Sequence, residues 1–199
     1  MTSAIAQLLP DLIAADPPAP ARAPGPVRLR EIPFPAQVEL RIDDEESASF
    51  EPRAGQFLGC GMPGPGHATG DGSPHVLWLG PGWYLIVDRT GCAPGLLAGL
   101  HDALGGECGG VCGSAVDVSA ARTILELSGP AAPAVLSHGC PLDLHPRVFV
   151  PGRCARTRLA QVPIVLHQTG AGEYRLLAAS SYAVHLVHWL RDAMIEYLG

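Results

Sequence analysis

A strand that runs directly into a tight turn and a short helix is the feature that most limits how this chain can fold. Residues 122–127 (RTILEL) place strand-forming and apolar residues around a polar position, as in a half-buried β-strand. The sequence Ser128-Gly129-Pro130 then breaks the strand, and a proline suits the first helical turn because its missing N–H is not needed there. We expect a helix over residues 131–137, ended by Gly139 in a left-handed conformation.

Similar patterns on both sides predict hairpins that alternate with helices. The acidic segment 43–49 (DDEESAS) and the glycine-rich segment 59–72 are predicted to be loops. The other predicted strands are 27–32, 37–42, 75–79, 82–87, 157–167 and 174–178, and the other predicted helices are 93–104 and 182–198. Because the strands come as hairpins, the fold class we expect is α+β, with mainly antiparallel sheets and packed helices.

The chain of 199 residues is long enough for one domain or for two small lobes that share a core. The order of the predicted elements indicates two lobes, residues 27–112 and residues 113–199. Residues 1–26 begin with a helical apolar pattern broken by Pro10 and end in PPAPARAPGP, so we expect a flexible tail with a semi-rigid linker. Two interpretations of this tail stay open: a docking arm for a partner, and a frayed terminus.

Composition excludes several classes of function. The net charge is −6 and the 13 basic residues are scattered, which argues against a nucleic-acid partner. No apolar run approaches the length of a membrane span, and the amino terminus lacks the basic residues of a secretory signal, so we expect a cytoplasmic protein with reduced thiols. Hydrophobic residues make up 47% and charged residues 16%, a balance that favours a subunit with part of its surface against a partner.

Motifs for catalysis, cofactors and metals are missing from the sequence. It has no GxSxG or SxxK nucleophile motif and no dinucleotide or P-loop fingerprint. Two groups have ligand types suited to zinc. Cys108 and Cys112 have a spacing that zinc ligands use, but a structural zinc needs four ligands and the sequence has no second close pair. His138, Cys140 and His145 match no common zinc motif. We therefore predict no catalytic, cofactor-binding or metal residue in this chain.

One segment carries a resemblance to a known family. The sequence GCPLDLHPR (139–147), followed by FVPGRCARTRLAQVPIVL (149–166), resembles the gamma subunits of heterotetrameric sarcosine oxidases. The preceding DVS and LELSGPAAPAVL segments are similar to the amino-terminal part of the wider aminomethyltransferase family. The match to the gamma subunits extends more loosely from about Val38 to Trp189, so it covers most of the chain.

This resemblance implies a subunit without its own chemistry. In such oxidases the alpha subunit carries the NAD and tetrahydrofolate sites, beta holds FAD, FMN lies between alpha and beta, and delta is a small metal-binding subunit. The complex oxidises sarcosine to glycine and passes the one-carbon unit to tetrahydrofolate. The resemblance therefore implies an aminomethyltransferase-like fold, no cofactor in this chain, and partners alpha, beta and delta, with alpha the most direct contact.

Two regions are the candidate contacts with such a partner. The first contains Leu144, His145, Arg147 and Phe149, within and just after the GCPLDLHPR motif. The second contains Trp78 and Trp83 in the hairpin predicted from strands 75–79 and 82–87, which we call the aromatic hairpin. Two alternatives remain: a stand-alone folate-binding or one-carbon protein of the aminomethyltransferase fold, and a small cysteine- and histidine-containing metalloprotein.

Overall fold

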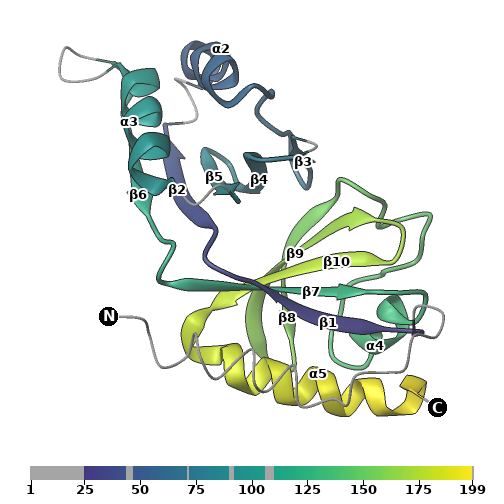
Figure 1. Cartoon of the computed structure of the whole chain (residues 1–199). Helices are drawn as coiled ribbons and strands as arrows, with labels where there is room; N and C mark the ends of the chain where they lie inside the picture. Colours follow the sequence, from purple (N-terminus) through teal and green to yellow (C-terminus); the bar gives the residue numbers. More distant parts are fainter. Residues whose placement is uncertain (1–24, 44–46, 71, 90–91, 106–109, 199) are drawn as a thin grey trace. The chain divides into compact units, whose positions relative to one another are not determined.

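The chain folds into two compact units, each built on one five-stranded antiparallel sheet (Figure 1). The computed structural model describes residues 25–43, 47–70, 72–89, 92–105 and 110–198. Unit 1 comprises the described part of residues 1–33 together with 121–199, and unit 2 comprises residues 34–120. The predicted tail, residues 1–26, falls almost entirely outside the described residues.

Unit 1 has the strand order β1-β7-β10-β9-β8. Its strands are β1 (Arg28–Ile32), β7 (Arg122–Ser128), β8 (Cys154–Leu159), β9 (Val162–Gly170) and β10 (Glu173–Ala179). The helices α4 (Ala132–Ser137) and α5 (Ala183–Leu198) pack on one face of this sheet, and a short 3-10 turn, η3 (Ser180–Tyr182), precedes α5. The core between sheet and helices is apolar, with Leu127, Leu166 and Leu176 against Leu186 and Leu190.

Unit 2 has the strand order β3-β4-β5-β2-β6. Its strands are β2 (Ala36–Ile42), β3 (Ala68–Thr69), β4 (His75–Gly80), β5 (Trp83–Asp88) and β6 (Gly113–Asp117), and its helices are α2 (Ser47–Leu58) and α3 (Ala93–Leu104). Val38, Leu40 and Ile86 from the sheet pack against Phe50 and Leu100 from the helices. The expected α+β class with antiparallel sheets is confirmed in both units.

The division into units differs from the contiguous lobes 27–112 and 113–199 that the sequence suggested. β1 pairs with β7 in unit 1, with Ile32 opposite Ile124, although β1 lies before all of unit 2 in the chain. β6, by contrast, pairs with β2 in unit 2. Pairing between distant strands sets these boundaries, so unit 2 is inserted between two neighbouring strands of unit 1.

The segment predicted as one strand, residues 157–167, is a hairpin. β8 ends at Leu159, β9 begins at Val162, and these two residues are register partners. The turn residues Ala160 and Gln161 have φ values of 49° and 68°, the left-handed pair that a two-residue hairpin needs. Glycine or asparagine usually occupies such positions, so the sequence contained no turn signal.

Helix α2 begins inside the segment predicted to be an acidic loop, residues 43–49, of which 44–46 lie outside the described residues. Pro52 lies within this helix and cannot donate a backbone hydrogen bond. Phe50, Ala54 and Leu58 lie one turn apart and are buried. Burial of this stripe stabilises the helix against the effect of the proline.

The sequence predicted that Gly139 ends helix α4 in a left-handed conformation, and this prediction is wrong. The φ angle of Gly139 is not positive. α4 ends with the N–H groups of Gly139 and Cys140 donating to the carbonyl oxygen of Leu136. A Cβ on Gly139 would lie 2.6 Å from the ring of Trp189 on α5. The position therefore requires glycine for close packing against α5 rather than for backbone conformation.

Replacing Gly139 with alanine is expected to lower the free energy of unfolding by about 1–3 kcal/mol, the usual cost of an overpacked site. Gly64→Ala is the matched control, because no atom lies within 4 Å of a Cβ there. The control is expected to change stability by less than about 0.5 kcal/mol in chemical denaturation. Equal stability of the two variants would show that the contact with Trp189 is not tight.

Candidate interaction surfaces

Hydrogen bonds within the loop after α4 give it a defined shape. The Asp143 carboxylate accepts a bond of 2.9 Å from the backbone N–H of His145. The ring Nδ1 of His145 accepts one of 3.2 Å from the N–H of Arg147. The carbonyl oxygen of His145 accepts bonds from the N–H groups of Val148 and Phe149, at 2.8 and 3.0 Å. These bonds form a compact turn in the segment 143–149.

The turn buries two apolar side chains and exposes two others. Leu144 and Phe149 are 7% and 5% exposed and belong to the core of unit 1. Val148 and Val150, on either side of Phe149, are 53% and 39% exposed. Leu144 and Phe149 thus anchor the turn in the core of unit 1, and Val148 and Val150 remain exposed at the surface of this unit.

Of the four residues predicted near the motif, His145 and Arg147 are exposed and Leu144 and Phe149 are buried. Sequence reasoning did not single out Val148 and Val150 as surface residues. The sequence held no signal for them, because the segment is a hydrogen-bonded turn, in which the side-chain alternation of an extended strand does not apply. We refer to His145, Arg147, Val148 and Val150 as the valine turn.

The two tryptophans of the aromatic hairpin lie on opposite faces of the unit 2 sheet. Trp78 pairs in register with Tyr84 and packs against the core that α2 and α3 cover. Trp83 pairs with Arg41, whose guanidinium carbon lies 4.0 Å from the centre of the indole ring, a cation–π contact. The structure therefore does not join the two rings into one flat stacking surface.

The candidate metal ligands have other contacts. The imidazole Nε2 of His138 lies 3.1 Å from the Tyr197 hydroxyl. The Cys140 thiol is buried and lies 3.9 Å from the Thr157 hydroxyl. Cys108 lies outside the described residues. Within the described ranges no three His, Cys, Asp or Glu side chains gather in a way that would hold a metal ion.

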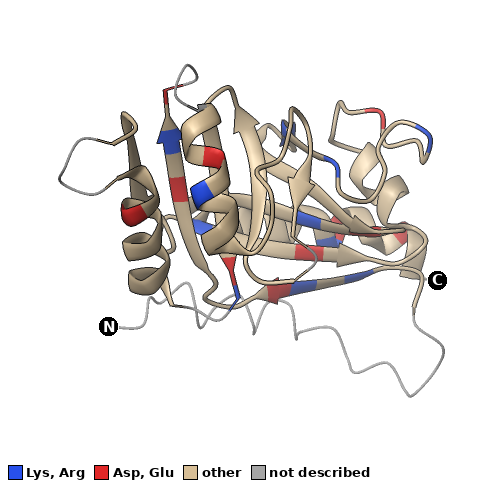
Figure 2. Cartoon of the chain, turned by 90° about the horizontal axis from the view of Figure 1, so that it is seen from above, with Lys and Arg blue, Asp and Glu red and all other residues tan. Residues whose placement is uncertain are grey.

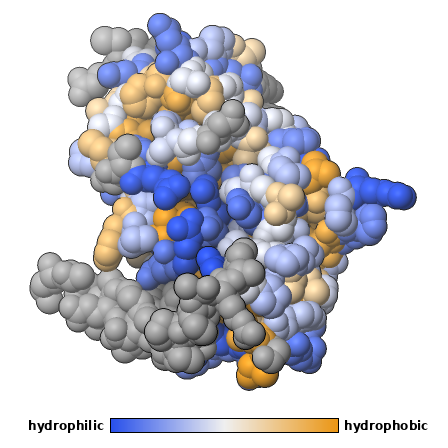
Figure 3. Space-filling model, turned by 45° about the vertical axis from the view of Figure 1, so that its right-hand side comes forward, coloured by the Kyte–Doolittle hydropathy of each residue, from blue (hydrophilic) through white to orange (hydrophobic). Residues whose placement is uncertain are grey.

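Charges are interspersed along the strands, with no large area of one sign in the view drawn in Figure 2. Apolar side chains likewise form separate patches on the face drawn in Figure 3. Among the described residues, the large apolar side chains with the greatest exposure are Phe34 (72%) and Ile195 (65%). No helix in the described part of the chain is long and apolar enough to cross a membrane.

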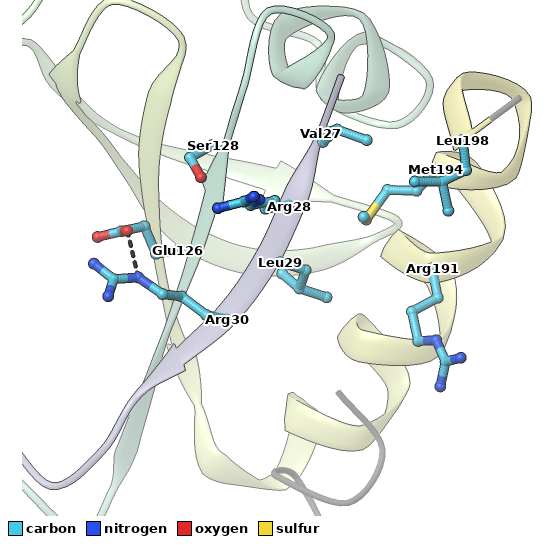
Figure 4. Close-up of a pocket in the computed structure, with 9 residues that line it drawn as sticks. All are labelled: Val27, Arg28, Leu29, Arg30, Glu126, Ser128, Arg191, Met194 and Leu198. Atoms are coloured by element: carbon cyan, nitrogen blue, oxygen red, sulfur yellow. Dashed lines mark hydrogen bonds and ion pairs between the residues drawn. The ribbon is translucent and has the colours of Figure 1, made fainter. Parts of the chain in front are cut away.

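A groove of about 410 Å³ lies between the edge strand β1 and the C-terminal half of α5 (Figure 4). Val27, directly before β1, and Leu29 on β1 point toward α5, and Met194 and Leu198 point back from the helix. The charged residues that line the groove are Arg28, Arg30, Arg191 and Glu126.

Glu126 is buried on the face of the sheet that bears Arg28 and Arg30. It accepts a 2.6 Å hydrogen bond from Nε of Arg30, and its other carboxylate oxygen lies 3.6 Å from Nε of Arg175. The hydrogen bond to Glu126 raises the pKa of Arg30. The one acidic side chain of the groove is therefore already paired, and the lining stays net positive.

Glu31, on the same strand, is half-buried and opposite Leu125. Burial raises the pKa of its carboxyl above the ordinary value of 4.5. A 3.3 Å hydrogen bond from the Thr123 hydroxyl acts in the opposite direction. Burial also raises the pKa of Tyr174, which lies in the core of unit 1.

Comparison with known proteins gives a consistent result. The family model described as "Sarcosine oxidase, gamma subunit family" matches residues 43–196. Sarcosine oxidase subunit gamma from an Arthrobacter species is 43% identical over 176 residues, which cover 87% of this chain and 82% of the relative.

Solved structures agree with the sequence matches. A chain of the heterotetrameric sarcosine oxidase from Corynebacterium sp. U-96, solved with pyrrole 2-carboxylate, is 38% identical, with a TM-score of 0.84 over 98% of this chain and 95% of that one. The aminomethyltransferase of the glycine cleavage system from Bartonella henselae is 14% identical, with a TM-score of 0.59 over 83% of this chain and 45% of that one. The second match shows a shared fold alone. The expected aminomethyltransferase-like fold is confirmed, and the stand-alone folate-binding alternative is not favoured.

Glu31 predicts a specific dependence of stability on pH. Its folded-state pKa lies above 4.5, so the folded chain holds more protons than the unfolded chain above that pH, and stability falls as pH rises through the window. Relative to the wild type, Glu31→Gln is expected to gain stability as pH rises from 4.5 to 7 in urea titrations. Thr123→Val, which removes the opposing hydrogen bond, is expected to enlarge the fall. A stability difference between wild type and Glu31→Gln that does not change with pH would contradict this reasoning.

Proposed function

This chain belongs to the sarcosine oxidase gamma subunit family, and from this premise we propose that it is a non-catalytic subunit of a heterotetrameric sarcosine oxidase. The complex would oxidise sarcosine to glycine and pass the one-carbon unit to tetrahydrofolate. The observation that carries the proposal is the 38% identity and near-complete coverage shared with a chain of a heterotetrameric sarcosine oxidase.

The proposal assigns the chemistry to the partner subunits. FAD, FMN, NAD and tetrahydrofolate would be bound by alpha and beta, with delta as the remaining partner and the cytoplasm as the location. The sequence supports this assignment, because it has no dinucleotide-binding fingerprint to hold a flavin or a nicotinamide. Within the described residues the valine turn is a surface feature with defined shape, which suits a contact role.

The valine turn is the contact surface that we propose for the alpha subunit. Its backbone is held by the hydrogen bonds of Asp143 and His145 and by the buried anchors Leu144 and Phe149. A surface fixed before binding loses little conformational entropy on association, so its apolar side chains contribute more fully to affinity. Val148 and Val150 would form the apolar centre of the contact, with His145 and Arg147 at its polar edge.

Unit 2 offers a second proposed contact at its aromatic hairpin. Trp83 is only partly covered and is held by the guanidinium of Arg41. Tryptophan and arginine are the residue types most enriched at the energetic centres of interfaces. Trp78 packs on the core of unit 2, so its proposed part is to support the hairpin and contribute its exposed edge.

An aspartate at Val148 tests the valine turn. Val148→Asp would place an uncompensated charge in the contact, and we expect the affinity for the partner subunits to fall at least about tenfold. Ile195→Asp is the matched control, since this residue is a β-branched side chain of unit 1, is 65% exposed and lies on α5. Co-purification through a tag on this chain and binding by interferometry measure the effect.

The control variant is expected to bind like the wild type. Circular dichroism of both variants checks that their folds are intact. Full binding by Val148→Asp would show that the valine turn is not part of the interface, while the chain would still be a subunit of the complex. Absence of any complex between the wild-type chain and the partner subunits would overturn the subunit assignment itself.

A further inference from the structure

The groove between β1 and α5 has features that the proposed subunit role does not use. Its floor is apolar, with Val27, Leu29, Met194 and Leu198 facing one another. Leu198 is 46% exposed in spite of its size, and Leu29 is only partly buried. Among the strands of the described residues β1 lies at the edge of its sheet, with β7 as its one neighbour there. Such an edge is usually covered or protected by charge.

We propose that the groove binds the N-terminal segment of the same chain, through the apolar side chains of residues 5–13. Three independent features select this segment over other occupants: its point of attachment, the spacing of its apolar residues, and its charge. Residues 1–24 lie outside the described part of the chain, and all three features are properties of their sequence and of the described groove.

The point of attachment favours this segment as the occupant of the groove. The described chain starts at Gly25, and Val27, two residues later, already lines the groove. The intervening residues 17–26 (PPAPARAPGP) would span up to about 30 Å at roughly 3.1 Å per residue in an extended proline-rich chain. Helix α5, with 16 residues, is about 24 Å long. The linker therefore reaches every part of the groove, and tethering gives an effective concentration on the order of millimolar.

The spacing of apolar residues fits an elongated apolar groove. Ile5, Leu8, Leu9, Leu12 and Ile13 follow the i, i+3, i+4, i+7, i+8 pattern that places side chains on one face of a helix. Pro10 would kink a helix at this point, but it is not one of the five apolar residues of the pattern. Without a surface to cover them, five large apolar side chains within nine residues would be exposed to water.

Charge complementarity favours the same occupant. Residues 1–21 contain two aspartates, Asp11 and Asp16, and no lysine or arginine. Arg28 and Arg30 extend from the edge strand toward Ser128 and Glu126, on the face of the sheet away from α5, so they lie at the β1 rim of the groove. Arg191 lies on the α5 side, and the one acidic residue of the lining, Glu126, already pairs with Arg30. An acidic apolar segment is therefore matched to the apolar floor by its leucines and to the basic rim by its aspartates.

Hydrogen–deuterium exchange tests the proposal on the full chain, alone and in complex with its partner subunits. Backbone amides of 27–32 and 191–198 are compared with those of a chain that starts at residue 17. In the full chain we expect exchange at both sites to be at least about threefold slower than in the shortened chain, at every protein concentration. A synthetic peptide of residues 1–16, added in excess to the shortened chain, is expected to restore the slow exchange.

Point variants separate the groove from general destabilisation. Leu198→Asp is expected to reproduce the fast exchange of the shortened chain, and Ile195→Asp, one turn away and outside the groove, to behave like the wild type. In the tail, Leu8→Asp is expected to release the segment. Gln7→Asp adds the same charge at a polar position and is expected to leave exchange slow.

The other outcomes overturn the proposal. Equal exchange in the full and shortened chains would show that the segment does not bind the groove. Protection that grows with protein concentration would assign the groove to a second copy of the chain. Protection that appears only in the complex, and that is also seen when the complex contains the shortened chain, would show that a segment of a partner subunit occupies the groove. None of these results bears on whether the chain is a subunit, because complex formation is scored separately by co-purification.

Discussion

The antiparallel pairing of β1 with β7 is the contact on which the rest of the structure depends. It joins strands so distant in sequence that Arg30 and Glu126, which pair across it, are 96 residues apart. Closing such a long loop is entropically costly, so the pairing is favourable only because it also completes an apolar core and the ion pair between Arg30 and the buried Glu126. It makes unit 2 an insertion within unit 1, adds Val27 to the core of unit 1, and forms one wall of the groove against α5.

The turn formed by residues 143–149 has one set of residues that fixes its backbone and another set that stays at the surface for the proposed partner contact. In the segment 143–149, Leu144 and Phe149 are buried, and the hydrogen bonds of His145 fix the backbone between them. The side chains left at the surface then have a fixed arrangement, and the proposed partner would bind them without reordering the turn. The motif that carries the family resemblance thus supplies the buried anchor Leu144 and the exposed His145 and Arg147, and Val148 and Val150 beyond it complete the proposed contact.

Sequence patterns predicted the elements whose causes are local. The leucine periodicity of α3 and the alternation of β7 gave their positions to within a residue. Non-local causes stayed hidden: the glycine at 139 is required by Trp189, 50 positions later in the chain, and the β8–β9 turn uses Ala160 and Gln161 under the constraint of strand pairing. The same limit applies to the surface, since the sequence indicated the region 144–149 but not which of its side chains are buried.

The central claim is that this chain works as one subunit of a heterotetrameric oxidase. Native mass spectrometry of the complex that co-purifies with a tag on this chain, when it is expressed with its neighbouring oxidase subunits, tests that claim most directly. One copy each of four different chains, with bound flavin that gives the preparation a yellow colour, is the result the account predicts. A colourless preparation that contains this chain alone, while the other subunits assemble and oxidise sarcosine without it, would contradict it.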